Sequence, residues 1–348
     1  MSALSPRTRL TVVPPHRIAV GRCLSILVAL GIVALTLALM GRSPVELAGL
    51  VLRSTIGSRF GLEDLALFMT PLMLTGAAVW VGIRVNLWNI GAEGQFYAGA
   101  TAATAIGLFT HWPAFIALPV MVGAGALAGA GWIFVPAAAR AWLDVSEIVT
   151  SLLLNFVAAL VVSYLATGPW ADHVTGALVS TERLRVGLPE LWGVVHLGFP
   201  LALVVVAGLG IGLARSRFGY ETAVCGSNPQ AAHYAGIGVA PRILAVLLLS
   251  GALAGLAGVF EVAGTVHRLQ GSLANNYGYL GIVVALLARE SCLALIPAAL
   301  LMALILDTGI VLQTTQISSS AVLAITGLLV LAIAAGDELA AYVRVNRT

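Results

Sequence analysis

A ten-residue stretch from Asn86 to Gln95 gathers hydrogen-bonding side chains between two long apolar runs. It reads NLWNIGAEGQ, with the carboxylate of Glu93, the amides of Asn89 and Gln95, and two glycines that permit a break in a helix. Polar backbone between membrane spans is tolerated only where it faces protein, water or a ligand. Side chains of these types either bind an uncharged polar solute or brace neighbouring helix ends, and the residues alone leave both roles open.

A polar stripe follows on a later predicted helix. Glu147, Ser151 and Asn155 recur every four residues in the run SEIVTSLLLN, so they share one helical face. Polar side chains within an apolar span are expected to face the protein interior. The stripe therefore joins helices by hydrogen bonds or lines a solute path, and both interpretations stand.

A third polar group lies near position 277. Asn276 offers an amide there, and Tyr277 and Tyr279 carry rings of the kind that stack on flat solutes. Tyrosines of this kind also anchor spans at the membrane interface. The pattern is typical of both roles.

The composition indicates a lipid environment for the elements that carry these groups. Of 348 residues, 59% are hydrophobic and only 9% are charged, and the mean hydropathy is +1.00. A soluble domain is typically about half apolar and a quarter charged. The sequence therefore predicts an all-α polytopic membrane protein organised as a single transmembrane domain over residues 1–348.

The same composition excludes several kinds of site. All 18 basic residues are arginine, so the chain carries neither a Walker lysine nor a Schiff-base lysine. Its three cysteines lie far apart and its histidines form no HExxH motif, so we expect no metal site. A net charge of +3 gives no reason to expect a nucleic-acid partner, and no nucleophile and base pair suggests an enzyme.

Apolar runs near the ~20 residues that a bilayer crossing needs predict about ten transmembrane helices. With the N-terminus inside, twelve of the 18 arginines fall on the cytoplasmic side, as the positive-inside rule expects. Both termini are then cytoplasmic, the 168–196 connection is external and the 215–240 stretch is cytoplasmic. The predicted spans cover about 18–40, 65–83, 90–109, 114–138, 146–167, 197–214, 242–264, 277–288, 292–312 and 321–335.

The cytoplasmic stretch contains a predicted short helix. Asn228 is a suitable N-cap and Pro229 a suitable first residue. Ala231, Ala232 and Ala235 would give this helix a face of small residues. The stretch is either a solvated loop or a helix that docks into a groove of a partner.

This stretch resembles the coupling segment of ATP-binding-cassette (ABC) importer permeases, although Thr222 departs from the common EAA pattern. The resemblance implies that a cytoplasmic ABC ATPase, which binds ATP and magnesium itself, docks here; this chain is expected to bind no cofactor. The matching residues are Gly219, Glu221, Ala223, Gly226, Asn228, Ala231, Ala232, Tyr234 and Gly236, with Ala235 and Ile237 beside them.

Three further runs resemble the nucleoside-type branch of these permeases, relatives of ribose and branched-chain amino-acid permeases. They are Asn89–Gln95, Ser146–Asn155 and Asn275–Ala288, with Ser146, Ala288 and Glu290 departing from the usual residues. The order and spacing of the matches make the resemblance specific from about 65 to 310. It implies a substrate path lined by Asn89, Glu93, Gln95, Glu147, Ser151, Asn155, Asn276 and Tyr277.

The resemblance implies a permease subunit without an ATPase site in the inner membrane of a bacterium. Its expected partners are a second permease chain in a heterodimer and an extracytoplasmic substrate-binding protein. The expected solute is a nucleoside or a similar small polar molecule. Ribose-like sugars are the alternative within the family, and an ion-gradient-driven secondary transporter is the alternative from another class.

Overall fold

The computed structural model describes residues 27–28, 30–172, 179–288, 291–315 and 317–342. The start of the first predicted span, residues 18–26, and the arginines near both termini lie outside these residues. The chain divides into two units, residues 1–51 with 309–348 and residues 52–308. In the first unit, a helix over Leu30–Leu39 is followed at an angle of 118° by α2 (Pro44–Thr55), and α13 covers Ser319–Tyr342.

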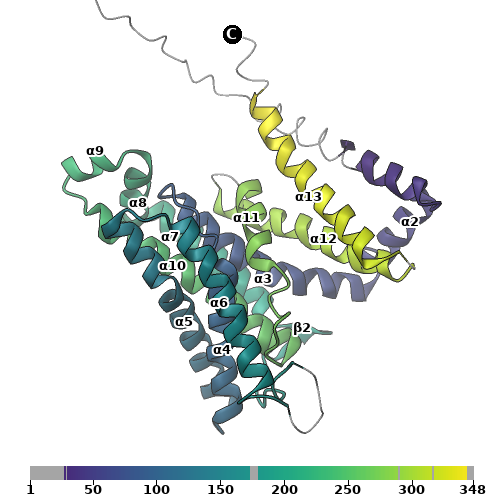
Figure 1. Ribbon diagram of the computed structural model, residues 1–348, viewed down its shortest axis with the longest axis horizontal. Helices are drawn as coiled ribbons and strands as arrows, with labels where there is room; N and C mark the ends of the chain where they lie inside the picture. Colours follow the sequence, from purple (N-terminus) through teal and green to yellow (C-terminus); the bar gives the residue numbers. More distant parts are fainter. Residues whose placement is uncertain (1–26, 29, 173–178, 289–290, 316, 343–348) are drawn as a thin grey trace, which may run out of the picture. The chain divides into compact units, whose positions relative to one another are not determined.

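The second unit is mainly helical, with one short hairpin and two isolated β-bridges in the part of the chain that the structure describes (Figure 1). A hairpin of β1 (Glu190–Trp192) and β2 (Val195–His196) lies in the long connection before α7. The helices are α3 (Arg59–Ile83), α4 (Ala92–Phe109), α5 (Ala114–Leu143), α6 (Glu147–Thr167), α7 (Gly198–Arg215), α8 (Arg217–Ser227), α9 (Pro229–Tyr234), α10 (Val239–Phe260), the π-helix η1 (Glu261–Val266), α11 (Tyr277–Ala288), η2 (Cys292–Ala294) and α12 (Leu295–Gln313).

Six of the described helices are long and apolar enough to cross a membrane, or seven if the bent pair in the first unit is one span. They bear out a polytopic helical membrane protein. α11 has 12 residues and is about 18 Å long at 1.5 Å per residue. It is therefore too short to cross a hydrocarbon core of about 30 Å by itself.

Glycines bring the backbones of α4, α5 and α10 into contact. A Cβ on Gly255 of α10 would lie 2.3 Å from the carbonyl oxygen of Gly125 in α5. A Cβ on Gly258 would lie 2.0 Å from the carbonyl oxygen of Phe96 in α4. Small residues allow this close approach, which supplies packing where lipid provides no hydrophobic driving force.

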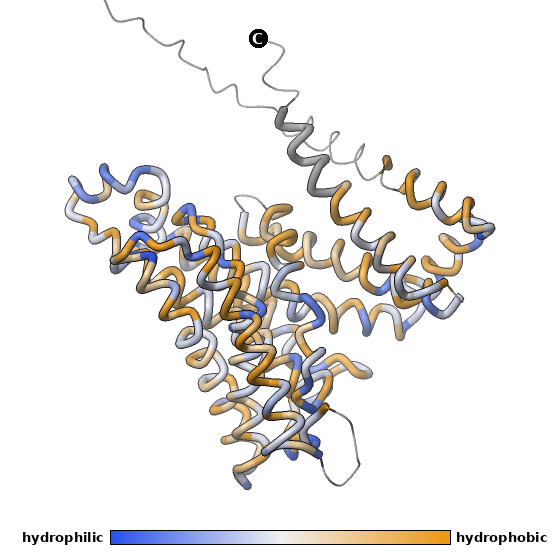
Figure 2. Tube along the Cα trace, in the orientation of Figure 1, coloured by the Kyte–Doolittle hydropathy of each residue, from blue (hydrophilic) through white to orange (hydrophobic). Residues whose placement is uncertain are grey.

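Hydrophilic residues are frequent over the two short helices α8 and α9. Figure 2 shows hydrophobic residues along most of α5, α6 and α10 and hydrophilic residues over α8 and α9, at the upper left. α8 begins at Ser216, whose Oγ accepts a hydrogen bond from the backbone N–H of Gly219 at 3.1 Å. This cap satisfies a free amide at the helix start. The 215–240 stretch is therefore largely helical.

Candidate functional site

The Asn86–Gln95 stretch is a helix break in the structure. α3 ends at Ile83, Asn86 has a positive φ of 58°, and α4 begins at Ala92. The carboxamides of Asn89 and Gln95 pair through two hydrogen bonds of 2.7 and 2.8 Å. Asn89 also donates to the Oγ of Ser250 in α10 at 2.7 Å. The break thus joins α4 to α10 through buried amides.

Glu93 connects the starts of two helices. It lies in the first turn of α4, and its Oε2 accepts a hydrogen bond from the backbone N–H of Gly278 at 2.7 Å. The first amides of a helix have no intrahelical partner and attract negative charge. Glu93 therefore caps α11 from a neighbouring helix.

The stripe predicted on α6 faces the same break. The Oδ1 of Asn155 accepts from the Gly94 N–H at 2.8 Å, and its Nδ2 donates to the Ile90 carbonyl at 2.9 Å. Glu147 accepts from the N–H of Trp88 at 3.2 Å. Each contact saturates backbone groups that the break leaves without helical partners.

We call Asn89, Glu93, Gln95, Glu147, Asn155 and Ser250 the polar hub. All six side chains are buried, and they link α4, α6, α10 and α11. Ser151, the remaining residue of the predicted stripe, is also buried and packs against Gly91. The structure therefore brings together every predicted path residue except Asn276 and Tyr277. The hydrogen bonds of the hub residues show that these side chains hold helices together. That they also line a solute path stays a prediction.

The other two predicted path residues lie beside the hub. Tyr277 is buried and its ring centroid lies 6.2 Å from that of Phe96, so its ring packs within the protein. Its carbonyl accepts from the hydroxyl of Thr75 at 2.9 Å. Asn276 is exposed at a positive φ of 62°, and Tyr279 is half-buried. These two therefore have surface available near the hub.

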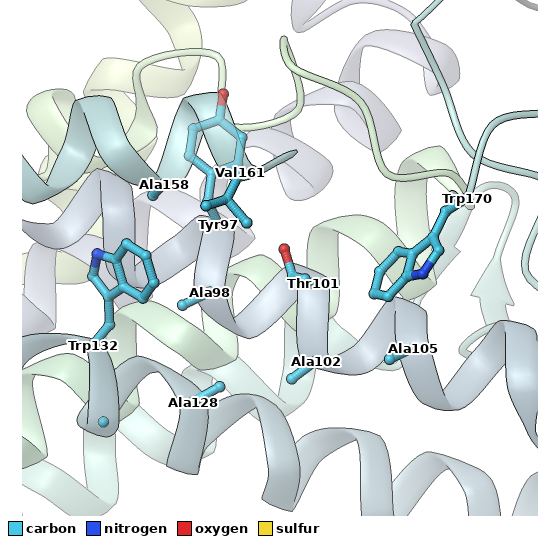
Figure 3. A pocket seen from close by; sticks show the side chains of 11 residues that line it. Tyr97, Ala98, Thr101, Ala102, Ala105, Ala128, Trp132, Ala158, Val161 and Trp170 are labelled. Atoms are coloured by element: carbon cyan, nitrogen blue, oxygen red, sulfur yellow. The ribbon is translucent and has the colours of Figure 1, made fainter. Parts of the chain in front are cut away.

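A crevice of about 340 Å³ runs along α4, α5 and α6. Figure 3 shows Trp132 and Trp170 at opposite ends of it, with alanines between them. The hydroxyl of Tyr97 points away and donates to the carbonyl of Gly271. A nucleoside or sugar needs several polar partners, and Thr101 is the hydroxyl that this lining offers besides Tyr97. The crevice is therefore poorly suited to such a solute.

The short helix predicted within the 215–240 stretch is present as α9 (Pro229–Tyr234). Asn228 is its N-cap, with Oδ1 accepting from the Ala231 N–H at 3.0 Å, and Pro229 occupies the first turn. Both predictions are confirmed. Tyr234 at the end of α9 is 91% exposed, so α9 presents an aromatic ring to its surroundings.

The predicted small-residue face of α9 is only partly correct. Ala231 and Ala235 are exposed, but Ala232 is completely buried inside the chain. A six-residue helix turns less than twice, so one of its alanines points inward to pack on its own protein. Ala232 is therefore a packing residue, and a substitution there would test folding before docking.

The rest of the predicted coupling segment is fixed by internal contacts. Glu221 is buried and bound by Arg217 of α8, at 2.6 Å, and by Arg242 of α10. Gly219 and Gly226 meet backbone: a Cβ on Gly226 would lie 2.1 Å from the Arg84 carbonyl oxygen. Ala223, Asn228 and Gly236 are exposed. The exposed surface is thus α9 and one side of α8.

Sequence reasoning missed several partners. Ser250 is a lone hydroxyl in the apolar run of α10, and nothing in its spacing marks it. Arg140 contacts both Asp144, at 2.5 Å, and Glu147, at 3.4 Å. Arg140 precedes Glu147 by seven residues, a spacing at which two helical turns or a tight bend bring the two side chains together. This spacing is the signal that could have predicted the ion pair. Among the described residues, no group of three metal-ligating side chains occurs.

Comparison with known proteins gives one consistent result. A family model for the permease component of branched-chain amino acid transport systems matches residues 61–334. The glucose ABC transporter permease protein TsgB13 of Haloferax volcanii is 37% identical over 82% of this chain and 79% of its own length. The guanosine ABC transporter permease protein NupP of Bacillus subtilis is 34% identical over 67% and 69%. The nucleoside ABC transporter permease protein NupB of Lactococcus lactis is 28% identical over 74% of each.

Proposed function

Because the chain belongs to the family of permease components of branched-chain amino acid transport systems, we propose that it conducts nucleosides across the membrane. It is the permease subunit of an ABC importer and a multi-pass protein of the cell membrane. We propose about ten spans with both termini cytoplasmic, a second permease chain in a heterodimer and an ATPase partner that supplies ATP hydrolysis. An extracytoplasmic binding protein delivers the solute.

The exposed ring of Tyr234 on α9 is the observation that supports ATPase docking most directly. α9 is capped by Asn228 and buries Ala232, so it is a fixed helix with an aromatic residue on its outer side. Tyrosine is among the side chains that contribute most at protein interfaces. The ATPase therefore docks on α9 and the exposed side of α8.

Tyr234→Ala tests this proposal, with Tyr164→Ala on α6 as the matched control because Tyr164 is 68% exposed. We expect Tyr234→Ala to fold normally but to bind the ATPase about thirtyfold more weakly on co-purification, the loss that an interface hot spot of about 2 kcal/mol gives. Tyr164→Ala retains it. Equal retention of the ATPase by both variants and the wild type would refute docking on α9.

We propose that the solute passes near Asn276 and Tyr279, which have exposed surface beside the polar hub. The predicted path residues Asn89, Glu93, Gln95, Glu147, Ser151, Asn155 and Tyr277 form the wall behind this surface. A wall of amides and hydroxyls, in which Glu147 pairs with Arg140 and Glu93 accepts from a backbone N–H, suits an uncharged solute. Tyr279→Ala should reduce nucleoside uptake more than it reduces the amount of folded protein.

Sugars are the second candidate, because a relative 37% identical to this chain is a glucose permease. Nucleosides are favoured because three of the relatives are guanosine or nucleoside permeases. Uptake of radiolabelled guanosine into proteoliposomes containing the whole transporter, competed with excess glucose or ribose, separates the two. Competition by the sugar alone, with no uptake of guanosine, would overturn the nucleoside assignment. ATP-dependent uptake without a proton gradient excludes a secondary transporter.

A further inference from the structure

The connection between α6 and α7 is fastened to the chain segment that follows α10. Asp172 pairs with Arg268 at 2.5 Å, and the Asp172 side chain is only 2% exposed. Beside this pair, the N–H of Thr181 donates to the Leu269 carbonyl at 3.0 Å. The Leu269 N–H donates in return to the Thr181 hydroxyl at 3.1 Å. An ion pair and a short backbone ladder thus join the two segments.

The same attachment continues along the connection. The N–H of Leu184 donates to the His267 carbonyl at 2.9 Å, and that of Leu188 donates to the Ala263 carbonyl at 2.8 Å. Ala263 belongs to the π-helix η1, where one carbonyl per added residue loses its usual partner. The connection therefore runs along residues 263–269 as a strap and satisfies backbone groups there.

A second attachment fixes the other end of the connection to α3. The N–H of Val194, in the turn between β1 and β2, donates to the Glu63 carboxylate at 3.2 Å. Gly193 has a φ of +54°, and a Cβ there would lie 2.0–2.2 Å from the Glu63 carboxyl atoms. Only glycine fits this turn. Glu63 is held in turn by Arg59 at 2.7 Å.

Both anchored elements lead to the polar hub. α3 runs into the Asn86–Gln95 break. Residues 263–269 lead through the 270–276 segment to α11, whose first amides are capped by Glu93. The connection therefore joins α3 to the 263–269 segment. The polar hub joins the parts of the chain to which these two elements lead.

We propose that Asp172 and Arg268 are positioning residues that transmit docking of the binding protein on the β1–β2 hairpin to α11 and the polar hub. This inference rests on the proposed function. The hairpin presents Leu191, Trp192 and Val194 as an exposed apolar tip, which provides the docking surface. Movement of the tip pulls on the strap, and the ion pair passes the movement to residues 263–269.

The test uses the whole transporter in proteoliposomes and measures ATP hydrolysis with and without nucleoside-loaded binding protein. Asp172→Asn keeps the size of the side chain and removes its charge; Arg268→Gln removes the charge of the partner and shortens its side chain. We expect each to lower the stimulation by the binding protein about fivefold or more, the lower range of allosteric coupling, while basal hydrolysis persists. The exchange Asp172→Arg with Arg268→Asp restores stimulation. Arg183→Gln, an exposed arginine of the same connection, leaves it unchanged.

Each remaining outcome decides the question. Unchanged stimulation in Asp172→Asn and Arg268→Gln overturns the inference while leaving the proposed function intact. Equal loss of basal and stimulated hydrolysis also overturns it, because the pair is then needed only for folding. Absence of ATP hydrolysis and of ATP-dependent uptake in the wild-type complex instead refutes the proposed function.

Discussion

Removing the Glu93 carboxylate should loosen α11 from α4. In Glu93→Ala the Gly278 N–H loses its acceptor, which costs about 1–3 kcal/mol for a buried donor. The favourable charge at the start of α11 is lost as well, for about 0.3–2 kcal/mol. We therefore expect destabilisation of roughly 2–4 kcal/mol. Glu93→Gln keeps an oxygen acceptor and should lose only the charge contribution.

The measurement is the thermal unfolding midpoint of the detergent-solubilised chain. At roughly 2 °C per kcal/mol, Glu93→Ala should lower the midpoint by about 4–8 °C, with Glu93→Gln between it and the wild type. Glu46→Ala is the matched control, since Glu46 is also in the first turn of a helix but is exposed. It should change the midpoint by about 1 °C or less, as surface changes do.

Uptake per folded molecule is the second readout for Glu93→Gln. We expect it to fall, because loosening the start of α11 displaces Asn276 and Tyr279 beside the proposed path. An unchanged midpoint in Glu93→Ala would refute the capping of α11. Unchanged uptake in Glu93→Gln would instead refute the assignment of Glu93 to the wall of the path and leave it as a brace.

Two further predictions follow from packing and protonation. Gly255→Val should destabilise the protein by about 1–3 kcal/mol or more, because the added Cβ meets backbone of α5. Gly208→Val is the control, since a Cβ there meets nothing within 4 Å, and it should not destabilise the protein. Equal thermal midpoints for the two variants would contradict the glycine contact. Burial lowers the pKa of His196 to about 4. The neutral imidazole therefore contributes fully to the free energy of unfolding above pH 6.5, and this contribution is lost as the pH falls to about 4. The loss is at most about 3 kcal/mol. Thermal midpoints across this range should fall less in His196→Gln; identical pH profiles would contradict the burial of a neutral imidazole.

The sequence predicted the positions of the long helices well. The observed bounds of α5, α6, α7 and α12 lie within a few residues of the expected spans, except that α5 extends to Leu143. Long apolar runs bounded by polar residues leave little choice in lipid, where backbone groups must bond within the segment. The Asn228 cap of α9 was equally predictable, because capping depends on a local pattern. The helix α2 was missed, since its charged residues lowered its apolar character.

The partners of the polar hub were not predictable from one sequence. The spacing of Glu147 and Asn155 predicted a shared face, and the structure confirms that both face the Asn86–Gln95 break. Which backbone amide each side chain meets depends on how the helices cross, and helical periodicity says nothing of that. Ser250 shows the limit, because its partner Asn89 lies 161 residues away. The burial of Ala232 was unpredictable for the same reason, because tertiary packing decides which side of a short helix is buried.

The polar hub lies where contacts from both predicted sides of the membrane meet. From the segment predicted to be cytoplasmic, Gly226 of α8 packs on the Arg84 carbonyl, only a few residues before Asn89. From the connection predicted to be external, the strap bonds to residues 263–269, which lead to α11 and hence to Glu93. A break of paired amides can exchange partners between helices in a way that a continuous helix cannot, because its hydrogen bonds run between elements rather than within one. The polarity of Asn86–Gln95 is therefore explained by its burial between these two attachments, where side-chain amides pair the backbone groups that the helix break leaves without partners.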